Sequence, residues 1–142
     1  MRRLFTFWRI VALLALALAA YAIIDLRLSA PSGPYVARHD VFGVIYSDTK
    51  RDALIRKLAE ESDVKAVVLR INSPGGTVTG AETLYEAIRT VAAQKPVVAM
   101  MGEVAASGGY LAAIGADHVL SRGNTLTGSI GVVKQEPDVQ AL

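Results

Sequence analysis

The stretch AVVLRINSPGG at residues 66–76 decides the fold that the sequence predicts. Residues 66–71 form a mainly apolar run of strand length, as expected for a parallel strand that is buried on both faces. Residues 72–78, which include Pro74, Gly75 and Gly76, indicate a loop after this strand. Open α/β sheets bind their ligands at the carboxyl ends of their strands, so this loop is a candidate for a functional site.

The segment before this stretch predicts a strand followed by a helix. Residues 35–46 are rich in β-branched and aromatic residues, which favour a strand. Ser47 and Asp48 then offer a helix N-cap, and a helix is expected over residues 49–61.

The segment after it continues the alternation of helices and strands. Thr79 and Glu82 form a capping-box pattern at the start of a second helix, which Lys95 and Pro96 end. Strands are then expected at residues 97–101, 119–120 and 125–133, with a third helix at 107–115. The alternation predicts an α/β fold of βαβ units with a mostly parallel sheet.

The composition of the 142 residues excludes several classes of function. The first 28 residues carry a net charge of +3, and the remainder carries 11 basic and 12 acidic residues, so nothing indicates nucleic-acid binding. The absence of cysteine excludes a disulfide framework, a thiolate nucleophile and a cysteine-based zinc site. His39 and His118 are isolated and too few for a histidine-rich metal site. No cofactor or metal is implied.

An apolar segment near the N-terminus predicts a membrane anchor. Residues 10–24 are uncharged but shorter than the ~20 residues that span a bilayer. Residues 4–8 lengthen the segment if Arg9 extends its side chain to the interface, beside Trp8. We therefore expect an anchor or transmembrane helix at residues 1–28, a linker at 29–34 and one globular domain at 35–142.

The charges around this segment predict its orientation. Arg2, Arg3 and Arg9 precede it and only Arg27 follows it, which places the N-terminus inside and the domain on the extracytoplasmic side. The alternative is a cleavable signal peptide, because ALA at 17–19 and AYA at 20–22 resemble cleavage sites. The apolar residues continue past both of these sites and favour an uncleaved anchor.

Two glycine-containing loops, 72–76 and 102–109, follow consecutive predicted strands. Glycine lets a substrate carbonyl approach backbone N–H groups closely, so such loops can build an oxyanion hole. Ser107 stands between small residues where a strand loop turns into a helix, and its hydroxyl is a candidate nucleophile. The alternative is that Ser107 only caps the helix and that the glycines only make turns.

Three strings occur in an order that resembles peptidase family S49: INSPGG at 71–76, AASGGY at 105–110 and TLTGSIG at 125–131. The resemblance implies a ClpP/crotonase-like fold and a serine peptidase that needs no cofactor. It also implies that Ser107 is the nucleophile and that the N–H groups of Gly76 and Gly108 form the oxyanion hole. Ser129 matches the serine that orients a lysine base, although a plain turn serine is the alternative.

The lysine base of that family lies well downstream of the nucleophile. Lys134 is the one lysine after Ser107, and we interpret it as a solvated surface residue. We therefore expect the base to lie beyond Leu142, which would make the 35–142 domain incomplete. Glu103 is expected to be solvated or bonded to loop N–H groups, and Met100 and Met101 are expected to fill the core.

The function expected from this resemblance is a membrane-anchored serine endopeptidase of the Ser/Lys type. It would degrade hydrophobic peptides such as cleaved signal peptides, as a homo-oligomer in the cytoplasmic (inner) membrane with its domain on the periplasmic side. Two alternatives stay open. One is a crotonase-type acyl-CoA enzyme, and the other is a catalytically inactive anchored domain that binds peptides or partner subunits.

Overall fold

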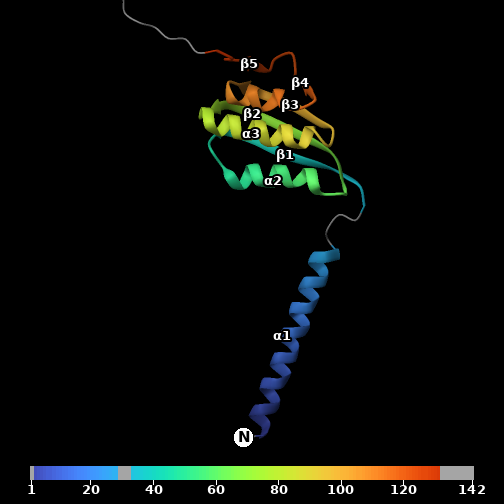
Figure 1. The fold of residues 1–142 in the computed structure, drawn as a ribbon. Coiled ribbons are helices and arrows are strands. Elements are labelled where there is room, and N and C mark those ends of the chain that lie inside the picture. Colours follow the sequence, from blue (N-terminus) through green and yellow to red (C-terminus); the bar gives the residue numbers. More distant parts are fainter. Residues whose placement is uncertain (1, 29–32, 132–142) are drawn as a thin grey trace, which may run out of the picture. The chain divides into compact units, whose positions relative to one another are not determined.

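The computed structural model describes residues 2–28 and 33–131, in two compact units, Met1–Gly33 and Pro34–Leu142. The first unit holds one helix, α1 (Arg2–Leu28) (Figure 1). Its segment Phe7–Asp25 has a mean hydropathy of 2.2 and buries none of its residues within the protein. By length and composition this helix could cross a membrane, and a signal sequence would have the same properties. Four of the six predicted linker residues, 29–32, lie outside the described part.

The second unit alternates strands and helices, as the sequence predicts. In chain order its elements are β1 (Tyr35–Ile45), α2 (Thr49–Glu60), β2 (Val64–Gly76), α3 (Val78–Ala92), β3 (Val97–Ala106), α4 (Gly108–Ile114), β4 (His118–Leu120) and β5 (Leu126–Gly128) (Figure 1). The strand order is β1-β2-β3-β4, β5 also pairs with β3, and all these pairs are parallel. The predicted α/β class with a parallel sheet is confirmed.

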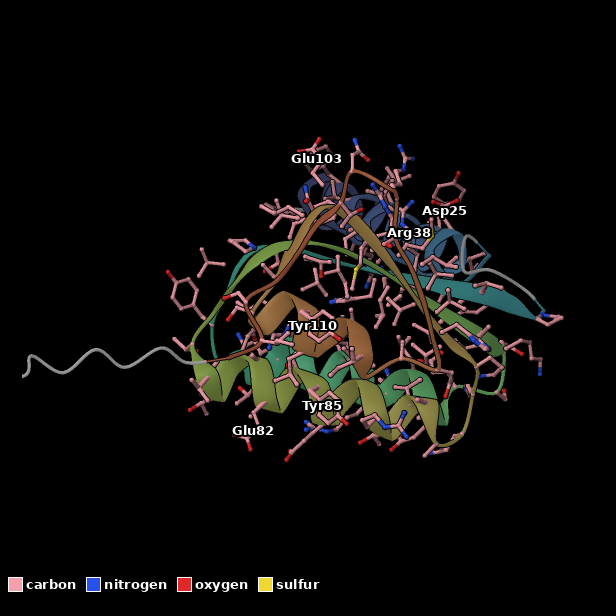
Figure 2. All side chains as sticks on the ribbon, turned by 90° about the horizontal axis from the view of Figure 1, so that it is seen from above. Asp25, Arg38, Glu82, Tyr85, Glu103 and Tyr110 are labelled. Atoms are coloured by element: carbon pink, nitrogen blue, oxygen red, sulfur yellow. The ribbon has the colours of Figure 1, made fainter. Side chains whose placement is uncertain are left out.

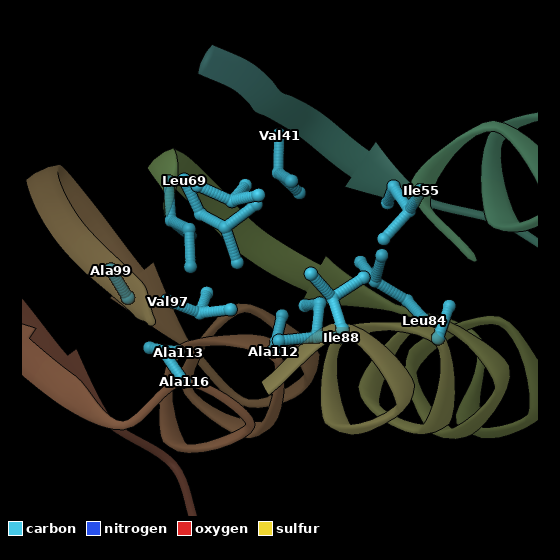
Figure 3. Packing of buried hydrophobic residues seen from close by; sticks show 14 of the residues in the cluster. Val41, Ile55, Leu69, Leu84, Ile88, Val97, Ala99, Ala112, Ala113 and Ala116 are labelled. Atoms are coloured by element: carbon cyan, nitrogen blue, oxygen red, sulfur yellow. The ribbon is translucent and has the colours of Figure 1, made fainter. Parts of the chain in front are cut away.

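The hydrophobic core lies between the sheet and the helices. Figure 2 shows α2, α3 and α4 on one face of the sheet. Along β1, Ala37, Val41 and Ile45 are buried while the residues next to them are not, as expected for a strand that packs on one side. Leu69 of β2 belongs to the same buried cluster as Leu84 of α3 and Ala112 of α4 (Figure 3). This layer of apolar side chains holds the loops at the strand ends in place.

For the two long helices of this unit, one predicted N-cap is confirmed and the other is wrong. Asp48 caps α2, because its carboxylate accepts hydrogen bonds of 3.0 Å from the N–H groups of Lys50 and Arg51. Thr77 rather than Thr79 caps α3, and its hydroxyl accepts a hydrogen bond from the Gly80 N–H at 3.2 Å. The helix therefore begins one residue before the predicted cap.

Both predicted glycine loops belong to strands over most of their length. β2 continues through residues 72–76 because Gly75 and Gly76 pair with the end of β1, after an irregularity in the register. β3 continues through residues 102–106 because its end pairs with β5. The strand predicted at 125–133 is confirmed only over Leu126–Gly128, and residues 132–133 lie outside the described part.

The core-filling role is confirmed for one of the two methionines. The exposed fraction is 7% for Met101 and 46% for Met100. The alternation of β3 explains the difference, because the two side chains point to opposite faces of the sheet.

Candidate active site

Ser107 occupies a strained turn between β3 and α4. Its backbone has φ 51° and ψ −120°, a conformation that residues with a side chain seldom adopt. Its hydroxyl makes no capping hydrogen bond to α4, and the residue is exposed. The interpretation that Ser107 only caps the helix therefore finds no support in the geometry. A strained strand-to-helix turn is a known way of presenting a nucleophilic serine.

The end of β2 lies directly against the Ser107 turn. Gly75 has φ +105°, and a Cβ added to it would lie 2.8 Å from the Ser107 Cβ and 2.9 Å from the Gly108 nitrogen. Only glycine therefore fits at this position without displacing the turn. Ser73 supports the same segment, because its buried hydroxyl accepts a hydrogen bond of 3.1 Å from the Gly75 N–H.

The two predicted oxyanion donors lie close together. A Cβ added to Gly108 would lie 3.5 Å from the backbone nitrogen of Gly76. Gly108 is the first residue of α4, so its N–H has no partner within the helix. Both glycines line the pocket that Ser107 lines. Both residues therefore lie in the region where an oxyanion would form if Ser107 attacked a carbonyl.

Strand β5 brings Ser129 to the same place. The Ser107 N–H donates to the carbonyl of Gly128 at 2.9 Å, and the Thr127 hydroxyl donates to the carbonyl of Ala105 at 2.8 Å. Ser129 follows directly with φ 54°, and it lines the pocket beside Ser107. The structure thus gathers Ser107, Gly76, Gly108 and Ser129 at one pocket. Their catalytic roles stay predictions.

The pocket at Ser107 has a volume of about 610 Å³ and a largely apolar wall. Side chains from α3, α4 and the segment after β5 form this wall, namely Val78, Ala81, Tyr85, Tyr110, Leu111, Ile114 and Ile130. Among its described lining residues Glu82 carries the one charge, and none is a lysine or histidine. Figure 2 labels Glu82 and Tyr85 on α3 and Tyr110 on α4. The wall suits apolar side chains of a ligand.

Glu103 lies at a different pocket, of about 590 Å³, with Arg70 and Arg122. Its side chain is exposed, and it does not line the pocket at Ser107. The expectation that Glu103 is solvated is confirmed. Within residues 2–28 and 33–131, no group of three His, Asp or Glu side chains is placed to hold a metal ion.

Two residues without an expected role help to build the site. The Asn72 side-chain oxygen accepts a hydrogen bond of 3.0 Å from the Val104 N–H, which joins the end of β2 to β3. Ser73 holds Gly75, as described above. Ser73 is buried and Asn72 is half-buried in β2, and polar side chains at such strand positions need hydrogen-bond partners. This signal could have indicated both residues, but the interpretation of residues 72–78 as a loop conceals it.

Comparison with known proteins connects this site to a family. Residues 89–142 match the model of peptidase family S49. The resemblance to peptidase family S49 is confirmed. The chain is 46% identical over 79 residues to a chloroplastic serine protease SPPA of Arabidopsis thaliana, covering 56% of this chain and 12% of that protein. It is 37% identical over 108 residues to a putative protease of Synechocystis sp., covering 75% of this chain and 39% of that protein. The chain thus spans well under half of the S49-like relatives that it matches.

Solved structures show the same fold. A membrane protease specific for a stomatin homolog from Pyrococcus horikoshii superposes with a TM-score of 0.55 at 20% identity, covering 70% of this chain and 51% of that one. An enoyl-CoA hydratase from Polaromonas sp. superposes with a TM-score of 0.51 at 16% identity, covering 68% and 48%. At these identities the likeness concerns the fold alone, and the ClpP/crotonase-like fold class predicted from the sequence is confirmed.

Proposed function

We propose that this chain is part of a membrane-anchored serine endopeptidase of family S49 that cleaves hydrophobic peptides. The observation that carries the proposal is the strained, exposed Ser107 in a pocket that Gly76, Gly108 and Ser129 also line. The match of residues 89–142 to the S49 model supports the same conclusion, because this range includes Ser107 and Ser129.

The reaction proceeds through an acyl-enzyme. The Ser107 Oγ attacks the scissile carbonyl and its proton passes to a neutral amine base, while the N–H groups of Gly76 and Gly108 bind the oxyanion. The C–N bond then breaks and the leaving amine takes the proton from the base. The same base then takes a proton from a water molecule, which attacks the ester carbonyl. When the ester C–O bond breaks, the base gives this proton to the Ser107 Oγ, and the acid product leaves.

The base in this proposal is a lysine outside the described residues. The described lining of the pocket contains neither lysine nor histidine, so the proton acceptor has to enter from another segment or subunit. Ser129 would accept a hydrogen bond from that amine and orient it. An environment with little water would lower the pKa of this lysine and keep its amine neutral.

The substrates in this proposal are apolar peptides such as signal peptides released into the membrane. Val78 and Ile130 are 83% and 77% exposed at the pocket, and burying such side chains against an apolar peptide would stabilise the complex. The exposed apolar helix α1 supports an anchor that keeps the domain at the membrane, on the extracytoplasmic side. We also propose that the protein acts as a homo-oligomer.

The test is turnover of an internally quenched apolar peptide by the full chain in detergent. The assay compares residues 1–142 with the same chain joined to the lysine-bearing segment of an S49 relative. Ser107→Ala should abolish turnover, since losing a covalent nucleophile costs on the order of 10⁶ in rate. Ser62→Ala, at an exposed turn remote in sequence from the strings of the site, is the matched control. Unchanged turnover in Ser107→Ala would refute the assignment.

The absence of a base among the described lining residues favours one second candidate, an inactive domain that binds peptides. The same assay separates the two candidates when peptide binding is followed by fluorescence anisotropy. Binding without Ser107-dependent turnover in either chain would identify a binding domain.

A further inference from the structure

A partly buried ion pair lies behind the candidate site. Asp52 of α2 is 3% exposed, and the side chain of its neighbour Arg51 is 15% exposed. The Arg51 Nε and Nη2 atoms donate to the same Asp52 oxygen at 2.9 and 2.7 Å. A charged pair this well covered costs desolvation energy, which its hydrogen bonds have to offset. The pair is also remote in sequence from every residue of the site.

The guanidinium of Arg51 also joins two segments of backbone. Its Nη1 donates to the carbonyl of Tyr46, just after β1, and its Nη2 donates to the carbonyl of Gly80, in the first turn of α3, both at 3.3 Å. One planar group, held in place by Asp52, thus spans α2, the end of β1 and the start of α3. Arg51 thus binds the backbone of both of these last two segments.

The end of β1 lies directly behind Gly76. A Cβ added to Gly76 would lie 1.8 Å from the carbonyl oxygen of Ile45, the residue before Tyr46. The same carbonyl accepts a hydrogen bond of 2.9 Å from the N–H of Thr77. The position of the Gly76 N–H therefore follows the position of the Ile45–Tyr46 backbone.

The start of α3 lies directly behind Gly108. A Cβ added to Gly108 would lie 2.8 Å from the Cβ of Ala81, the residue after Gly80. The two segments also touch each other, because a Cβ added to Gly80 would lie 2.5 Å from the backbone carbon of Tyr46. Each predicted oxyanion donor thus rests on a segment whose carbonyl Arg51 binds.

We propose that Arg51, fixed by Asp52, is a positioning residue that sets the distance between the N–H groups of Gly76 and Gly108. It touches neither a substrate nor the nucleophile and acts through the backbone behind the two donors. The proposal rests on the function proposed above, since an oxyanion hole matters only to a chain that stabilises an oxyanion. A lysine could keep the charge at residue 51 but could not reproduce the planar fork that reaches three acceptors.

The test compares Arg51→Lys with Arg89→Lys in the full chain in detergent, with and without the lysine-bearing segment described above. Arg89, in the last turn of α3, is a matched control because its guanidinium also donates to a backbone carbonyl, that of Gly115. Selective ¹⁵N labelling of the 12 glycines gives a readout that needs no activity. Arg51→Lys should shift the amide signals of Gly76 and Gly108 and leave those of Gly33 and Gly123 in place.

The kinetic readout separates positioning from a general loss of stability. We expect Arg51→Lys to lower kcat about 10- to 100-fold with KM within about twofold, because displaced donors weaken transition-state binding more than substrate binding. Arg89→Lys should change neither value. If Arg51→Lys does not fold, Asp52→Asn, which keeps the guanidinium but loosens it, is subjected to the same two measurements.

The possible outcomes have distinct meanings. Unchanged Gly76 and Gly108 signals in Arg51→Lys would overturn the positioning role, as would equal shifts of all glycine signals. Shifted signals with lowered kcat would support it. Shifted signals in a protein that shows no Ser107-dependent turnover even when the lysine-bearing segment is joined to it would support the positioning of the two N–H groups and refute the peptidase function.

Discussion

At the scale of single residues, the site depends on backbone conformations that few side chains tolerate. Ser107 has φ 51° and Ser129 has φ 54°, although neither residue is a glycine. Strain of this kind costs on the order of 1–3 kcal/mol and persists only where the surroundings fix it. The surroundings here are Gly75, whose missing side chain admits the Ser107 turn, and β5, whose Gly128 carbonyl binds the Ser107 N–H.

The four candidate site residues stand out in the sequence because each lies in a short string that contains glycine, and the resemblance to family S49 implies their roles, which stay predictions. The sequence alone could not predict which backbone atoms meet. Gly76 lies near Gly108 because β2 and β3 are neighbours in the sheet and because the first turn of α3 packs against Gly108. Arg51 escaped prediction for a similar reason, since its acceptors include Gly80, 29 residues away, and a charged residue on a helix more often faces solvent.

His39 is expected to make stability depend on pH. It is half-buried in β1, and burial, followed by the positive charge of Arg51, lowers its pKa below the ordinary value, while Asp40 acts in the opposite direction. Between the lowered folded pKa and the unfolded value near 6.5 the unfolded chain binds more protons, so the free energy of unfolding rises with pH. The contribution is complete above about pH 6.5 and is lost as the pH falls through the folded pKa.

His39→Gln should therefore flatten the rise of the unfolding free energy as the pH increases toward about 6.5, measured by denaturant unfolding of the detergent-solubilised chain. His118→Gln, at an exposed position at the start of β4, is the matched control and should keep the wild-type slope. Identical slopes in the wild type and His39→Gln would show that His39 does not carry the dependence.

At the scale of elements, the sequence predicts which elements exist better than where they end. The apolar run at 66–71 correctly indicated a buried strand, but β2 extends to Gly76 because β1 supplies partners for its glycines. Pro74 and the two glycines that follow it favour a loop by their local preferences, and pairing between distant strands overrides those preferences. The same competition explains why β3 runs through Gly102 to Ala106.

The start of α3 gives a test of this difference. Thr77 is the cap in the structure, and Thr79 was the cap predicted from the pattern with Glu82. Thr77→Ala should lower the free energy of unfolding by about 1 kcal/mol, because the N–H of Gly80 loses its acceptor. Thr79→Ala, at an exposed position in the first turn, should change it by less than about 0.5 kcal/mol.

The measurement is denaturant unfolding of both variants beside the wild type. Circular dichroism of the folded state checks that the helix content is otherwise kept. A larger loss in Thr79→Ala than in Thr77→Ala would show that the capping box predicted from the sequence, and not Thr77, begins the helix.

At the scale of the whole molecule, the apolar helix and the globular unit have to be assigned to compartments. The α1 segment Phe7–Asp25 is apolar enough to span a bilayer, but a cleaved signal sequence would look the same. The charge asymmetry across it predicts that the N-terminus stays inside and that the globular unit is exported. The two interpretations of α1 agree on the side of the domain and differ on whether it remains attached.

The chain contains no cysteine, so a single introduced thiol reports the location of the domain without background. Ser62→Cys, at the exposed turn between α2 and β2, should react with a membrane-impermeant maleimide in intact bacterial cells whose outer membrane has been permeabilised. The labelled protein should resist extraction from membranes by alkaline carbonate if α1 remains as an anchor, and it should be extracted if α1 is cleaved.

Replacing Arg2, Arg3 and Arg9 by glutamine removes the charge asymmetry and should lower the labelled fraction, because the positive-inside rule then no longer favours export of the domain. Labelling that appears only after the cells are lysed would place the domain in the cytoplasm. A peptidase site there would meet no signal peptides released on the outer side, so that result would overturn both the orientation and the proposed substrates.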